Sequence, residues 1–139
     1  MYPTQITTIF FITNIAYAFV KQNYPIFFGA LPLYTTSLMY HYTKHYIKDS
    51  INTDLYKADV FFCVLGYLSA LYDYVTRNTI KPPYSTIFVG LHIGLPLTYI
   101  VSSRYNILMW NPDPQISEFW HSMFHTIIVI DTNFYLYNS

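Results

Sequence analysis

The chain has 139 residues, a length that suits a single domain. Only 10% of these residues are charged, 53% are hydrophobic, and the formal net charge is zero. Soluble domains carry roughly 25% charged residues, so the composition argues against a soluble protein and favours one that is surrounded mostly by lipid. A chain without net positive charge also lacks the electrostatic footprint of nucleic-acid binding, and we expect no nucleic-acid partner.

Five segments of the chain have the apolar character of membrane-crossing helices, which need about 20 residues. In chain order they cover residues 5–20, 25–42, 58–75, 84–101 and 117–136. The sequence therefore predicts an all-α, polytopic transmembrane helix bundle of about five spans. We expect one transmembrane domain over residues 1–139, in an integral membrane protein whose membrane the sequence does not specify.

The last predicted span has a clear start. Asn111-Pro112-Asp113-Pro114 interrupts any helix that precedes it, because proline lacks the backbone N–H that a helix interior requires. Ser117 is the predicted N-cap, and Glu118 in the first turn suits the positive end of the helix dipole. This span is unusual in carrying several ionisable side chains.

Three histidines lie at the ends of predicted spans. His121 and His125 are four residues apart, so a helix presents both rings on one face. His41 ends the second span, and the alternating direction of five spans brings it to the same side of the membrane as the other two. Three imidazoles can bind one zinc ion and leave a position open for water. The sequence predicts one Zn²⁺ site with His41, His121 and His125 as ligands.

Two further side chains are predicted to serve catalysis at this site. Asp59 opens the third span on the same side of the membrane, where it can orient or deprotonate a water as general base. Ser37 lies one turn before His41, and its hydroxyl can steady that water or a developing oxyanion. Ionisable groups are costly inside a membrane, so they are usually functional or paired.

The remaining buried polar candidates receive structural interpretations. His92 is interpreted as a histidine that bonds across helices, and His45, which forms a rival His-x-x-x-His pair, as a solvated loop residue. Asp73 is expected to be a solvated span end near Arg77. Asp131 is expected to pair with a polar group of the first span, such as Asn14.

These residues also form an ordered set of motifs. Ser37-Leu38-Met39-Tyr40-His41 closes one span, Lys57-Ala58-Asp59-Val60 opens the next, and His121-Ser122-Met123-Phe124-His125 opens the last. This order resembles the CREST superfamily of membrane hydrolases, which includes alkaline ceramidases, progestin and adipoQ receptors and transmembrane-protein-8-like lipid remodelling proteins. The resemblance is to a shortened form, because family members have seven spans and this chain has about five.

The resemblance implies a function as well as a fold. It implies a zinc ion held by His41, His121 and His125, with Asp59 and Ser37 serving the zinc-bound water. It further implies hydrolysis of an amide or ester bond in a membrane lipid. Loss of two consecutive spans keeps the direction of the last one, so the ligands of a shortened member still lie on one side of the membrane.

A second hypothesis is a non-enzymatic small subunit of a larger membrane complex. Its aromatic-rich spans would pack against other membrane subunits, and its histidines would bond across helices or bind a cofactor such as haem. The two hypotheses differ in whether the isolated chain binds zinc.

Overall fold

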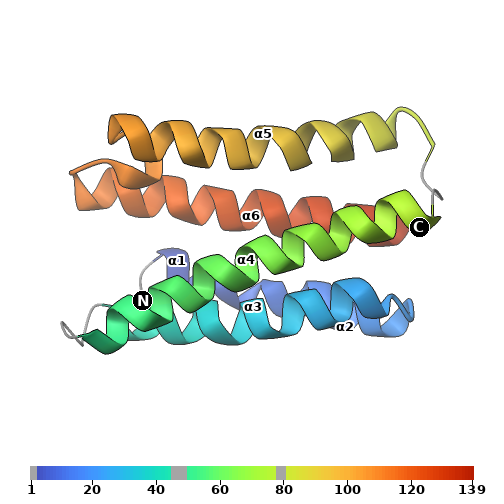
Figure 1. The fold of residues 1–139 in the computed structure, drawn as a ribbon, viewed down its shortest axis with the longest axis horizontal. Coiled ribbons are helices and arrows are strands. Elements are labelled where there is room, and N and C mark those ends of the chain that lie inside the picture. The colour runs from blue at the N-terminus through green and yellow to red at the C-terminus, as the bar shows by residue number, and fades with distance from the viewer. Residues whose placement is uncertain (1–2, 45–49, 78–80) are drawn as a thin grey trace.

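The computed structural model describes residues 3–44, 50–77 and 81–139, and every regular element in these ranges is a helix. The predicted all-α fold is therefore confirmed for the described residues, and His45 lies outside them. Figure 1 shows the long helices arranged along one axis, with α5 beside α6. The elements are α1 (Pro3–Ile9), α2 (Phe11–Val20), α3 (Tyr24–Thr43), α4 (Ser50–Arg77), α5 (Tyr84–Tyr105), the 3-10 turn η1 (Leu108–Trp110) and α6 (Pro114–Asn138).

Helix α6 starts earlier than predicted. Its N-cap is Asp113, whose carboxylate accepts a backbone hydrogen bond in the first turn at 2.8 Å. Pro114 takes the first helical position, where its missing N–H costs nothing. Ser117 is thus not the cap, and its hydroxyl donates to the Met109 carbonyl at 2.6 Å, which ties η1 to α6.

Two segments among the described residues are long and apolar enough to cross a membrane. They are Asp54–Arg77, which lies in α4, and Tyr84–Trp110, which includes α5. The first of these segments begins four residues before the predicted span start at residue 58. Only 11% and 17% of their apolar windows are buried inside the protein. Large side chains such as Phe61 of α4 and Ile100 of α5 face outward. These helices therefore differ from the core helices of a soluble protein, which are mostly buried.

Helices α3 and α4 approach closely because glycines lie at their crossing. A Cβ added to Gly29 would lie 2.8 Å from the Ser69 hydroxyl and 3.1 Å from the Cα of Gly66. Small residues at such a crossing let two helix backbones pack against each other. The contact sets α4 against α3, so that Asp59 of α4 meets Ser37 of α3.

Asp73 joins three helices at the end of α3 that is remote from His41. Its Oδ2 accepts hydrogen bonds from the Asn23 amide at 2.6 Å and the Tyr135 hydroxyl at 2.8 Å, and its Oδ1 lies 2.7 Å from the Arg77 Nε. The carboxylate is 1% exposed, so the prediction of a solvated span end is wrong. The error arises because Asn23 and Tyr135 come from α2–α3 and α6, far away in the sequence.

Replacing Asp73 with asparagine is expected to destabilise the protein. The substitution turns one carboxylate oxygen, which accepts hydrogen bonds, into an NH₂ group, which can only donate. That NH₂ group then faces neighbouring donors with which it cannot form a hydrogen bond. Hydrogen bonds to a charged group contribute about 1.5–3 kcal/mol, so thermal unfolding in detergent should occur at a clearly lower temperature. The matched control is Asp54→Asn, because Asp54 pairs with Lys57 in solvent, with side chains 80% and 71% exposed. Equal unfolding temperatures for the two variants would contradict the assignment.

Candidate metal centre

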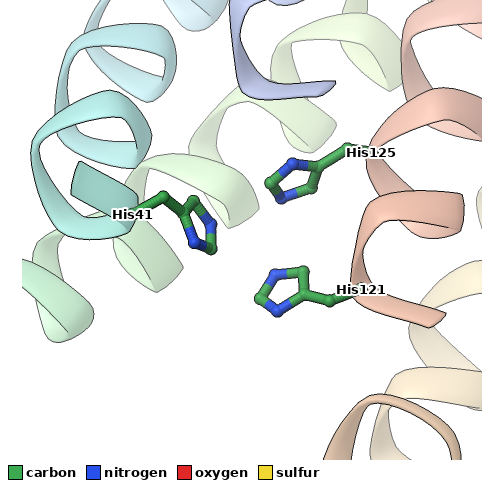
Figure 2. A group of neighbouring side chains, drawn as sticks. All are labelled: His41, His121 and His125. Atoms are coloured by element: carbon green, nitrogen blue, oxygen red, sulfur yellow. The ribbon is translucent and has the colours of Figure 1, made fainter. Parts of the chain in front are cut away.

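Three histidines from two helices converge on one point. His41 lies in the last turn of α3, and His121 and His125 lie one turn apart on α6. Figure 2 shows the three rings pointing toward one another. Their centroids are 4.8 to 5.0 Å apart, and one nitrogen of each ring lies within 4.8 Å of the others. The three residues are close enough to bind a metal ion, as the sequence predicts.

The donor set fits a borderline-soft divalent cation such as zinc. Imidazole nitrogens bind zinc at about 2.0–2.1 Å in a tetrahedral arrangement, which places them about 3.3 Å from each other. The observed separations reach up to 4.8 Å, so an ion would draw the three rings closer together. His41 is fully buried and His125 is 7% exposed. Three ligands also leave the fourth position of a tetrahedral ion open, as in catalytic zinc sites.

Ser37 of α3 and Asp59 of α4 face each other, one turn of α3 away from His41. Ser37 lies one turn before His41, is 1% exposed, and donates a hydrogen bond to the Asp59 carboxylate. Asp59 is 9% exposed, and its Oδ1 has no hydrogen-bond partner in the described part of the chain. This oxygen has acceptor capacity to spare, as a general base requires. The Ser37 hydroxyl therefore lies against the Asp59 carboxylate, and its role in steadying a water or an oxyanion stays a prediction.

An ion pair lies beside the histidines. Lys44, directly after α3, pairs with Glu118, which precedes His121 by one turn on α6, and both side chains are 16% exposed. The Thr4 hydroxyl donates to the second oxygen of Glu118 at 2.6 Å. Glu118 lies beyond the first turn of α6, so its predicted place at the start of the helix is wrong, and it instead links α1 and the end of α3 to α6. Sequence reasoning missed this pair, whose members are 74 residues apart.

Helix α1 covers the histidines with a polar face. Thr4, Gln5 and Thr8 are at most 3% exposed. The Gln5 amide donates to the backbone carbonyl of His41 at 3.0 Å, and the Thr8 hydroxyl lies 3.2 Å from the Nδ1 of His125. Sequence analysis missed these three residues. The signal was present, because polar residues at positions i, i+1 and i+4 of an apolar segment share one helix face.

A separate buried pair fastens α5 to α6. The Nδ1 of His92 lies 3.1 Å from the Oδ2 of Asp131, and the ring of Tyr67 stacks on His92 with centroids 4.8 Å apart. His92 thus bonds across helices, as predicted. The expected partner of Asp131 is wrong, because Asn14 donates to the Val129 carbonyl at 3.1 Å. The pair supplies no ligand atom to the histidine triad.

No protein-family model, curated protein or solved structure matches the chain. What the protein does is therefore inferred from the chemistry of the site. That chemistry consists of three converging imidazoles, a buried carboxylate held by a serine, and a polar helix that covers both ligand-bearing helices.

Proposed function

We propose that the protein is a zinc-dependent membrane hydrolase that cleaves an amide or ester bond of a lipid. The observation that carries the proposal is the convergence of His41, His121 and His125 beside the buried Ser37–Asp59 pair. The motifs that resemble the CREST membrane hydrolases contain these same five residues. Membrane lipids are accordingly the proposed substrates.

The bundle is proposed to lie in a membrane and to cross it about five times. Support comes from α4 and α5, which are long and apolar enough to cross and whose apolar windows are only 11% and 17% buried. Acyl chains would cover their outward-facing side chains. The continuous pair α1–α2, α3 and α6 lie along the same axis (Figure 1) and would complete the five crossings.

The residues of the site suggest a mechanism. A bound zinc ion would polarise the substrate carbonyl and make a nearby water more acidic. Asp59 takes a proton from that water on its free Oδ1 while the water oxygen attacks the carbonyl carbon. Ser37 holds the carboxylate in orientation. Asp59 then returns the proton to the leaving nitrogen or oxygen as the C–N or C–O bond breaks, which releases a carboxylic acid and an amine or alcohol.

Metal analysis of the detergent-purified protein, combined with lipid hydrolysis, tests this function. We expect about one zinc per chain, removal of that zinc by a strong chelator, and hydrolysis of lipid amides or esters in mixed micelles only when zinc is present. His92→Gln is the matched control, because it changes a buried histidine that lies outside the triad. A folded protein that contains no zinc, or lipid hydrolysis that continues after the chelator has removed the zinc, would overturn the proposal.

A non-enzymatic subunit of a larger membrane complex is the second candidate. The outward-facing apolar side chains of α4 and α5 favour it, since partner helices would cover them as lipid would. Purification in mild detergent distinguishes the two. A stoichiometric complex that contains no zinc favours the subunit, whereas a zinc-containing chain that hydrolyses lipids by itself excludes it.

A further inference from the structure

We propose that α1 presets the tautomer of His125, with Thr8 as the positioning residue. The proton of the neutral ring is held on Nδ1, and the lone pair of Nε2 is directed to the histidine triad. The N-terminal helix would then be part of the metal site although it supplies no ligand. The tautomer itself does not depend on bound metal, while its consequence for affinity rests on the proposed zinc site.

The hydroxyl proton of Thr8 already forms a hydrogen bond within α1. Thr8 donates to the backbone carbonyl of Thr4 at 2.7 Å, whereas its oxygen lies 3.2 Å from the Nδ1 of His125. A hydroxyl has one proton and two lone pairs, so toward the ring Thr8 acts as an acceptor. The Nδ1 of His125 must then carry the proton and donate.

A second threonine of α1 leads to the same assignment. Thr7 stands 3.3 Å from the same Nδ1 and has two carbonyls of its own helix, those of Pro3 and Thr4, as acceptors for its proton. The hydroxyl oxygens of Thr7 and Thr8 thus both lie near the Nδ1 of His125, with Thr8 the nearer, and a proton on that nitrogen can donate to them.

A neutral imidazole carries one proton, so Nε2 is left as a lone-pair donor. Figure 2 shows the ring of His125 between the ribbon of α1 and the rings of His41 and His121. The edge of the ring opposite α1 therefore faces the triad. Metal-binding histidines usually donate their second nitrogen to a nearby oxygen, which fixes the tautomer and the ring orientation. Here α1 provides that oxygen before any ion arrives.

Helix α1 is anchored to both α3 and α6, which fixes its position beside His125. Gln5 donates to the His41 carbonyl at 3.0 Å and Thr4 donates to Glu118 at 2.6 Å. The ring of Phe11, at the start of α2, packs edge-on against His125 with centroids 5.4 Å apart. The same short helix thus contacts both helices that carry the candidate ligands.

The tautomer can be measured in metal-free protein. We would label the histidines with ¹⁵N and record long-range ring correlations in detergent micelles, with His125 assigned from the spectrum of His125→Gln. We expect the proton on Nδ1 of His125 in the wild-type chain. A proton on Nε2 would overturn the inference, whether or not the protein binds zinc.

Substitution of Thr8 tests its role in the site. Thr8→Val keeps the shape but removes the acceptor, so we expect a mixed tautomer population and about 10- to 100-fold weaker zinc binding. Thr8→Ser should restore both readouts. Thr35→Val is the matched control, because Thr35 also donates to the carbonyl of its own helix at 3.0 Å but is exposed on α3.

The outcomes separate this inference from the proposed function. Wild-type zinc affinity and an unchanged tautomer in Thr8→Val overturn the role of Thr8 and leave the hydrolase proposal standing. A wild-type chain that binds no zinc, yet shows the Nδ1 proton and loses it in Thr8→Val, overturns the zinc hydrolase and supports the tautomer assignment.

Discussion

Replacing His41 with alanine is expected to abolish stoichiometric zinc binding and to reduce lipid hydrolysis to background. His41 is the one ligand from α3, and the two remaining candidates share one face of α6. The two remaining imidazoles give a zinc ion only two protein ligands, whereas catalytic zinc sites usually have three. We expect the zinc affinity to fall by more than about 100-fold, because changes to residues that merely orient ligands already cost about 10- to 100-fold. Competition with a chelator of known affinity measures the change.

Two controls accompany the His41 experiment. Helix content and thermal unfolding of His41→Ala show whether the variant folds, since the ring is fully buried. His92→Gln shows whether loss of any buried histidine has the same effect. One tightly bound zinc per chain in folded His41→Ala would exclude His41 as a ligand.

Replacing Asp59 with asparagine is expected to separate catalysis from metal binding. Asparagine keeps the size of the side chain and can still accept the Ser37 proton on its amide oxygen, but it cannot take a proton from water. General-base groups contribute about 10²- to 10⁴-fold to rate, so we expect kcat to fall by that factor while zinc content stays unchanged. Steady-state hydrolysis of the best lipid substrate, with metal analysis of the same sample, checks both parts.

Asp131→Asn is the matched control for Asp59→Asn. It removes another buried carboxylate, one that pairs with His92 and lies outside the triad. Folded Asp131→Asn should retain turnover. Full activity in Asp59→Asn would exclude Asp59 as the base, and loss of zinc together with activity would make it a ligand.

Much of the site could be predicted from the sequence because it depends on local geometry. The spacing of His121 and His125 places both rings on one helix face whatever surrounds them. The helical character of the described residues follows from long apolar segments separated by polar or proline-containing breaks. The alternation of spans then predicts that His41 lies on the same side as the other two histidines, and the structure brings the three together.

Other parts of the site required the tertiary structure. Thr8 and His125 are 117 residues apart, and Lys44 and Glu118 are 74 apart. No local spacing relates such residues, so their hydrogen bonds and ion pair exist only because the helices pack in this arrangement. For the same reason the exposure of Asp73 and the partner of Asp131 were predicted wrongly.

The amino-acid sequence indicates which residues are candidate ligands and which is a candidate base, since their chemistry and their spacing along a helix are local properties. The tertiary structure alone decided how these groups are held. The close crossing at Gly29 and Gly66 brings α4 to α3, and α1 turns its polar face to the histidines. The physical reason is that helix geometry sets distances over one or two turns, whereas contacts between helices depend on the packing of the whole bundle.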